Sequence, residues 1–313
     1  MTIKRVHGPI ISTTDINAHL RLFAGVFGLE PVCEQQLDPD AVHSTWGLSG
    51  ISARTIVLET PGTQSGIRLV EFDPPSPVEI RSPACALDTD ALKVIDFFAP
   101  DLETALDLLR DAGFEPTGEP AEYDLPAGRL YESHVWGSDG VVCAVLSGPL
   151  SYFSEFVRVT DQRFSEVLSI SGPVTDAEPA LDFYSQVLGL HVVSQYELND
   201  DSFRQLVGAT QEIRLRGFNV GTSCDEPYFG IIHYGLPAGS TRSLRDLSIM
   251  PHRGLVGATL YTDDIEGISA RCMAGRHTVI APLATVDLAP HGRAQSLTIR
   301  APHGIVHHLI QLN

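Results

Sequence analysis

The 313-residue sequence has no long apolar run and little basic charge. No stretch approaches the roughly 18 uninterrupted apolar residues that a membrane-spanning helix needs. The N-terminal segment also lacks the apolar core of a secretory signal, so we expect a cytoplasmic protein with no membrane partner. The formal net charge is −18, whereas nucleic-acid binding requires a basic surface that displaces counterions. We therefore expect no nucleic-acid partner.

Paired cysteines and nucleotide-binding motifs are also missing. The five cysteines are scattered, without a Cys-x-x-Cys pair, which predicts buried thiols and argues against a disulfide framework or a zinc knot. The sequence has no Gly-x-Gly-x-x-Gly, P-loop or Gly-x-Ser-x-Gly motif, so nucleotide binding and serine hydrolysis lose their usual support. The composition, 43% hydrophobic and 19% charged, is typical of an ordered globular chain.

The sequence does contain an internal repeat. Residues 14–29 align with residues 175–190 without a gap, at an offset of 176 − 15 = 161. Residues 128–146 align with residues 292–310, at an offset of 292 − 128 = 164. Because a repeated unit usually forms one supersecondary element of a shared core, the pattern predicts a duplicated architecture.

Each half of the sequence divides again into two units of the same layout. Every unit has a β-type run, then a helix beginning at an aspartate suited to be its N-cap, at Asp15, Asp101, Asp176 and Asp264. The helices are expected to end at glycines in the left-handed conformation, at Gly28, Gly113, Gly189 and Gly275. Three strand-like runs follow each helix. We therefore expect an α+β chain of four βαβββ modules, with modules 1–76 and 88–150 in a domain 1–150, and modules 160–236 and 252–313 in a domain 160–313.

This layout, with helices that end in Val26-Phe27-Gly28-Leu29 and Val187-Leu188-Gly189-Leu190, resembles the vicinal oxygen chelate superfamily. That superfamily includes glyoxalases, bleomycin-resistance proteins and extradiol dioxygenases. The resemblance implies two glyoxalase-like half-barrel domains built from paired modules. It also implies a pocket in which the first and last strands of each module hold a divalent metal such as Fe, Mn or Zn, with open positions for two substrate oxygens.

The metal-ligand positions implied by the resemblance are mostly occupied by residues that do not bind metal. The positions on the first strands fall on His7, Val94, Ser169 and Gly257, and those on the last strands on Arg68, Ala144, Gly230 and His308. His7 and His308 are thus the only candidate metal ligands, and they form an incomplete set without a carboxylate. We expect either no cofactor or a divalent metal held by these two residues.

Without a metal, acid and base side chains would have to perform the chemistry. The candidates for catalysis are His7, His308, Arg68 and Tyr261, which the pairing of the first and fourth modules would bring into one pocket. Histidine titrates near neutral pH, and tyrosine or arginine stabilises a charge that develops on oxygen. The candidates for substrate binding are Ser169, His233 and Arg300. A purely structural role for the histidines stays open.

The leading functional hypothesis is an isomerase or lyase-type enzyme that transfers protons on a small carbonyl-bearing or phenolic substrate. Two alternatives stay open: a metal-dependent extradiol ring-cleaving dioxygenase, and a non-catalytic protein that binds a small molecule and confers resistance to it. The expected partner is a small molecule. The sequence leaves open which modules pair and whether the chain forms a homodimer.

Overall fold

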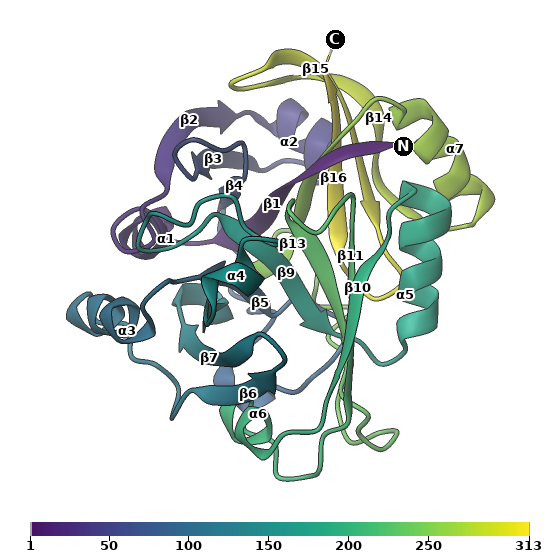
Figure 1. The fold of residues 1–313 in the computed structure, drawn as a ribbon. Coiled ribbons are helices and arrows are strands. Elements are labelled where there is room, and N and C mark those ends of the chain that lie inside the picture. The colour runs from purple at the N-terminus through teal and green to yellow at the C-terminus, as the bar shows by residue number, and fades with distance from the viewer. Residues whose placement is uncertain (1, 313) are drawn as a thin grey trace.

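The computed structural model describes residues 2–312, which form two curled eight-stranded sheets with helices packed against them (Figure 1). The sheet formed by the first and last modules of the chain, which we call the outer sheet, has the strand order β14-β15-β16-β13-β1-β4-β3-β2. The sheet formed by the two middle modules, which we call the inner sheet, has the strand order β10-β11-β12-β9-β5-β8-β7-β6. The predicted α+β class, with four modules that form two half-barrels, is confirmed.

The outer sheet comprises β1 (Ile3–Thr13), β2 (Glu30–Leu37), β3 (Ser52–Glu59), β4 (Gly66–Asp73), β13 (Gly254–Thr262), β14 (Thr278–Leu288), β15 (Gly292–Arg300) and β16 (Val306–Leu312). The inner sheet comprises β5 (Val94–Phe98), β6 (Ala121–Leu125), β7 (Gly128–Trp136), β8 (Val142–Ser147), β9 (Val167–Pro173), β10 (His191–Leu198), β11 (Leu215–Gly221) and β12 (Tyr228–His233). The α-helices are α1 (Ile16–Phe23), α2 (Pro39–Trp46), α3 (Leu102–Asp111), α4 (Leu150–Phe153), α5 (Ala177–Phe183), α6 (Asp201–Leu206) and α7 (Ile265–Ala274). Three shorter helical segments are η1 (Pro83–Cys85), η2 (Ser138–Gly140) and η3 (Tyr184–Leu188).

Each sheet combines one module from each half of the sequence. In the outer sheet, β1 pairs with β13 in antiparallel fashion, so the first module joins the fourth. In the inner sheet, β5 pairs with β9 in the same way, so the second module joins the third. The module boundaries remain a prediction, but the strand order shows that the sheets cut across the halves 1–150 and 160–313.

The four predicted N-caps are confirmed. The side chains of Asp15, Asp101, Asp176 and Asp264 accept hydrogen bonds from backbone N–H groups in the first turns of α1, α3, α5 and α7. Each carboxylate therefore satisfies a donor that has no partner within the helix and complements the helix dipole.

Three of the four predicted glycine ends have a left-handed φ: Gly28, Gly113 and Gly189. Helix α7 does end at Gly275, which is its C-cap, but the predicted left-handed conformation is wrong, because the φ of Gly275 is −76° and the left-handed residue is Arg276, with a φ of +55°. A Cβ on Gly275 would lie 2.7 Å from ring atoms of His277. Glycine at this position therefore leaves space for the His277 ring, and the left-handed backbone conformation occurs one residue later, at Arg276.

Two of the α-helices outside the four predicted ones occupy equivalent places in the first and third modules. Helix α2 lies between β2 and β3, and α6 lies between β10 and β11. Each packs against an edge strand of the partner module, α2 against β14 and α6 against β6. The two insertions therefore cover the two half-barrels in the same way.

Strand alternation in β5 separates the hydrophobic core from the functional face of the inner sheet. Ile95 and Phe97 belong to the main hydrophobic core, where the Phe97 ring stacks on Phe27 at a centroid distance of 4.2 Å. Val94 and Asp96 lie on the opposite face. Among residues 2–312, no helix is long and apolar enough to cross a membrane.

Candidate functional site

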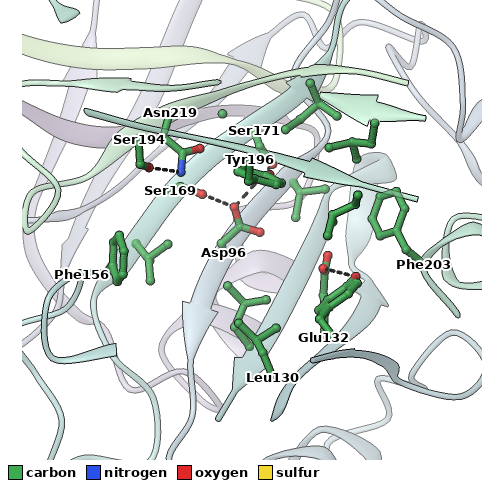
Figure 2. Close-up of a pocket in the computed structure, with 18 of the residues that line it drawn as sticks. Asp96, Leu130, Glu132, Phe156, Ser169, Ser171, Ser194, Tyr196, Phe203 and Asn219 are labelled. Carbon is green, nitrogen blue, oxygen red and sulfur yellow. Dashed lines mark hydrogen bonds between the residues drawn. The ribbon is translucent and has the colours of Figure 1, made fainter. Parts of the chain in front are cut away.

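The inner sheet encloses a cavity of about 300 Å³, which we call the inner cavity (Figure 2). Strands from both the second and the third modules line it, together with α6 and the segment that follows β8. Its volume lies at the lower end of those typical of small-molecule binding sites. The pairing of the second and third modules therefore creates a site of a size suited to a small substrate.

Aromatic side chains form much of the wall of the inner cavity. Tyr152 and Phe156 come from the segment after β8, and their ring centroids lie 5.0 Å apart. Phe203 comes from α6. The Tyr196 ring lies over Gly217, where a Cβ would approach the ring to 2.4 Å, and Tyr196 is 39% exposed. The walls thus suit a flat apolar or aromatic ligand, and Tyr196 marks the side open to solvent.

Asp96 lies in the middle of the inner sheet and faces the inner cavity. The hydroxyl groups of Ser169 and Ser171, both on β9, donate hydrogen bonds to its Oδ2 atom. Asp96 is 8% exposed, and burial raises its pKa to about 7 even though the two serine hydrogen bonds oppose this shift. The carboxyl group therefore exchanges a proton near neutral pH.

A second carboxyl group, Glu132, enters the inner cavity from β7. Its Oε1 atom accepts a hydrogen bond of 2.7 Å from His134 Nε2, and its Oε2 atom accepts one of 2.8 Å from the Tyr123 hydroxyl. Burial acts to raise the pKa of Glu132, but the hydrogen bond and the charge of His134 hold the pKa below its usual value. Glu132 is therefore a carboxylate at neutral pH, whereas Asp96 titrates there. Figure 2 shows both carboxyl groups in the space between Tyr196 and Leu130.

Lys93 is the basic residue of the inner cavity. Its backbone N–H donates a 2.8 Å hydrogen bond to Ser171, and its carbonyl accepts one of 3.2 Å from Val142. Lys93 is one of the residues that line the cavity, and it is 2% exposed. Burial lowers the pKa of Lys93 to about 7, and the positive charge of Arg81 adds to the effect. Two groups that titrate near pH 7, one acid and one base, thus face the same apolar space, an arrangement suited to proton transfer.

The four residues predicted to be catalytic come together in the outer sheet. His7, Arg68, Tyr261 and His308, which we call the outer cluster, lie on the four adjacent strands β1, β4, β13 and β16. The His7 and Tyr261 ring centroids lie 6.1 Å apart. The charge of Arg68 contributes to lowering the pKa of both His7 and His308, after the larger effect of burial. All four residues are buried.

One nitrogen of each imidazole in the outer cluster is hydrogen-bonded to a neighbouring side chain, whereas His7 Nδ1, His308 Nδ1 and Arg68 Nε have no partner within residues 2–312. His7 Nε2 lies 3.1 Å from Glu59 Oε1, and His308 Nε2 lies 3.0 Å from Ser296 Oγ. The Trp46 indole of α2 packs on His308 at a centroid distance of 4.8 Å. The buried tryptophan ring therefore covers part of the His308 ring. The catalytic roles of these residues remain predictions, and the inner cavity is lined by other residues.

The outer cluster does not fit a divalent metal. Arg68 places a buried guanidinium beside both imidazoles, and its charge repels a cation. Within residues 2–312, no group of three or more His, Cys, Asp or Glu side chains converges as a metal site would require. The donor set implied by the resemblance is thus incomplete in the folded chain as well as in the sequence.

The three residues predicted to bind substrate lie in different places. Ser169 lines the inner cavity and hydrogen-bonds to Asp96. His233 lies at the end of β12, where its Nδ1 atom accepts a hydrogen bond of 3.2 Å from the Gly235 N–H. Arg300 ends β15 and donates a hydrogen bond of 3.3 Å to the Gly304 carbonyl. Of the three, only Ser169 is placed by the structure against the inner cavity.

The sequence reasoning missed the charged residues of the inner cavity, although two signals were present. Asp96 interrupts the apolar run Val94-Ile95-Asp96-Phe97-Phe98, and a charged residue is rarely buried unless it has a specific role. Glu132 and His134 are two residues apart in a strand, so they face the same side. Neither Asp96 nor the pair Glu132 and His134 occupies a metal-ligand position implied by the resemblance, and the predicted catalytic residues were chosen near those positions.

Comparisons with known proteins agree with this architecture. Residues 167–306 match the model of the Glyoxalase/Bleomycin resistance protein/Dioxygenase superfamily. Glyoxalase I from Zea mays has a similar structure, with a TM-score of 0.64 and 11% identity over 98% of this chain and 92% of that chain. A putative dioxygenase from Bacillus subtilis subsp. subtilis str. 168 has a TM-score of 0.58 and 11% identity, over 99% of this chain and 86% of that chain. No curated protein sequence matches the chain. The resemblance to the vicinal oxygen chelate superfamily, glyoxalase-like and dioxygenase-like with duplicated domains, is thereby confirmed.

Proposed function

We propose that the protein is an enzyme that transfers protons on a small carbonyl-bearing or phenolic substrate, and that the reaction takes place in the inner cavity. The observation that carries the proposal is the Asp96 carboxyl group, buried among apolar residues with its pKa raised to about 7. A carboxyl group of this kind is effective both as an acid and as a base at neutral pH. The reaction class remains isomerase or lyase, as the sequence hypothesis has it, but the proposed site moves from the outer cluster to the inner cavity.

The neighbours of Asp96 support this role. Ser169 and Ser171 orient one carboxyl oxygen, Oδ2, while no hydrogen bond to Oδ1 occurs within residues 2–312. That oxygen is therefore free to take or give a proton. Glu132 supplies a fixed negative charge, and its hydrogen bond holds the His134 imidazole in place. The aromatic walls favour a flat substrate and exclude water from the acid, which strengthens its interactions with a bound molecule.

No step of this proposal involves a metal, because the residues at the metal-ligand positions do not form a donor set. The cofactor prediction thus becomes a proposal that the enzyme acts without one. The ring-cleaving dioxygenase stays an alternative because a putative dioxygenase has a similar fold. The non-catalytic binding protein also stays an alternative, since aromatic walls alone are sufficient to bind a ligand.

The test is solvent deuterium exchange into a panel of small ketones, keto acids and phenols, followed by NMR. The purified protein is compared with Asp96→Asn, which keeps the shape of the side chain and removes its titration. We expect the wild type to catalyse exchange at carbon next to a carbonyl or a phenolic oxygen. The variant is expected to lose about 10²-fold or more of the rate.

Two results would overturn the proposal. One is exchange that is unchanged in Asp96→Asn. The other is a panel member that raises the melting temperature of the wild type but undergoes neither exchange nor conversion, which would support the binding protein instead. A thermal shift measured on the same samples separates the two cases.

A further inference from the structure

The inner cavity contains a lysine in a chain that has almost none. Only two of the 21 basic residues are lysines, Lys4 and Lys93, and the rest are arginines. Lys4 is on the surface, where its Nζ atom lies 2.8 Å from Asp263 and its side chain is 61% exposed. Lys93 is 2% exposed and lines the cavity. Lys93 is therefore the only buried lysine of the chain.

The Lys93 amine has no partner of its own. Within residues 2–312, the structure contains no hydrogen bond and no ion pair to Lys93 Nζ, although buried amino groups are normally paired. The negative charge of Glu132 acts on Lys93, but the Glu132 carboxylate already accepts hydrogen bonds from His134 and Tyr123. A buried amine without a hydrogen bond, beside a cavity, points to a ligand group that reaches it.

The surroundings of Lys93 favour the neutral, nucleophilic form of the amine more than water does. Arg81 is 2% exposed, and its guanidinium donates hydrogen bonds to the carbonyls of Cys85, Asp88 and Ala91. It therefore fixes the loop that leads into β5 and places a permanent positive charge near Lys93. That charge, together with burial, lowers the pKa of the lysine. Desolvation and a neighbouring cation are the two means by which proteins activate a lysine for imine formation.

We propose that Lys93 forms an imine with an aldehyde or ketone substrate in the inner cavity. The Lys93 nitrogen bonds to the carbonyl carbon, the carbon–oxygen double bond is broken, and the oxygen leaves as water with the two hydrogens of the amine. The step is redox-neutral and needs no co-reactant. Asp96 carries one proton from nitrogen to the departing oxygen, which the hydrogen-bond-free Oδ1 permits.

This inference deepens the proposed function, on which it rests, because an imine is an electron sink. Once it is protonated, the C=N group withdraws electrons from the neighbouring carbon and makes a C–H or C–C bond at that carbon easier to break. Proton transfer at carbon then needs no metal to stabilise the enolate. The inference also narrows the substrate class from carbonyl or phenolic compounds to aldehydes and ketones.

The test is reductive trapping of the full chain with benzaldehyde and sodium cyanoborohydride at pH 7, followed by peptide mass mapping. The hydride reduces an imine to a stable secondary amine on the modified lysine. Because Lys4 is the only other lysine, it is an internal control in the same sample. We expect Lys93 to be modified at least tenfold faster than Lys4, and benzyl alcohol, which fills the cavity without reacting, to slow the modification of Lys93 only.

Modification of Lys93 at the rate of Lys4 or below would overturn the inference, and so would modification that benzyl alcohol does not slow. The test is independent of turnover, so the two proposals fail separately. Exchange that depends on Asp96 without an adduct on Lys93 leaves the proposed function standing alone. An adduct on Lys93 without any exchange activity supports imine formation and overturns the proposed function. Lys93→Arg keeps a long basic side chain but cannot form an imine, and its melting temperature shows whether it has folded.

Discussion

Asp96 and Ser169 lie opposite each other on neighbouring antiparallel strands, and the Ser169 hydroxyl donates a hydrogen bond to the Asp96 carboxyl group inside the inner cavity. The two residues come from the second and third modules, so this contact exists only because those modules share a sheet. It fixes one oxygen of the carboxyl group and leaves the other facing the cavity. The site is thus a product of the module pairing.

The titration of Asp96 is expected to make stability depend on pH in the acidic range. Its pKa is raised in the folded protein from 3.8 to about 7, so between these values the folded state binds a proton that the unfolded state does not. The free energy of unfolding therefore falls as the pH rises from about 4 to 7, by roughly 4 kcal/mol for three pKa units. Urea denaturation of the wild type and Asp96→Asn at pH 5 and pH 7 measures the effect. A difference between the two proteins that is the same at both values would contradict it.

Lys93 is expected to produce the opposite dependence in the basic range. Its pKa is lowered from 10.5 to about 7, so between these values the unfolded state holds a proton that the folded state has lost. Stability therefore rises with pH from about 7 to 10.5, by up to roughly 5 kcal/mol. In Lys93→Met this rise is expected to be absent, and the variant is expected to exceed the wild type in stability at pH 7. Denaturation of the wild type and Lys93→Met at pH 7 and pH 9 tests this prediction. A difference in the free energy of unfolding between the two proteins that is the same at both pH values would contradict it.

Trp46 is expected to stabilise the outer half-barrel without taking part in the reaction. Its side chain is 2% exposed and packs on His308, so Trp46→Ala leaves a cavity that costs about 3 to 5 kcal/mol. Met273→Ala is the matched control, since Met273 is 62% exposed and its loss should change stability by less than about 0.5 kcal/mol. Calorimetry measures both. At a temperature where Trp46→Ala is folded, its exchange rate should equal that of the wild type, and a lost rate would indicate that the outer half-barrel takes part in the chemistry.

Metal removal is expected to leave the exchange activity intact. Arg68 and the incomplete donor set give the outer cluster no means of holding a divalent ion. Dialysis against a chelator should therefore change the rate by less than twofold, and addition of Fe, Mn or Zn should not raise it. Metal analysis by mass spectrometry accompanies the assay. Activity that disappears on dialysis and returns with one of these metals would favour the dioxygenase alternative.

The fold could be predicted from the sequence because its signals are local and repeated four times. The caps at Asp15, Asp101, Asp176 and Asp264 depend only on the residues next to them, and all four are found. The helix α2 also had a local signal, since Asp38 caps it and Pro39 occupies its first turn, but it was hidden within a stretch interpreted as strands and turns.

The site was harder to predict because it depends on which modules pair. The metal positions implied by the resemblance fall on His7 and His308, which lie in one half-barrel, but His308 packs against Trp46 and His7 is hydrogen-bonded to Glu59. Asp96 and Glu132 both belong to the second module, but the third module supplies the other side of their cavity, including Ser169 and Tyr196. The spacing of residues along the chain does not show which module closes the cavity, because the second and third modules meet through contacts between distant segments.

The most direct test of the central claim compares two variants in the same deuterium-exchange assay. Asp96→Asn alters the inner cavity, whereas the double variant His7→Ala/His308→Ala alters the outer cluster. We expect Asp96→Asn to lose about 10²-fold or more of the exchange rate, and the double variant to stay within about threefold of the wild type at a temperature where it is folded. A double variant that is folded but inactive, beside a fully active Asp96→Asn, would contradict the claim and return the reaction to His7 and His308.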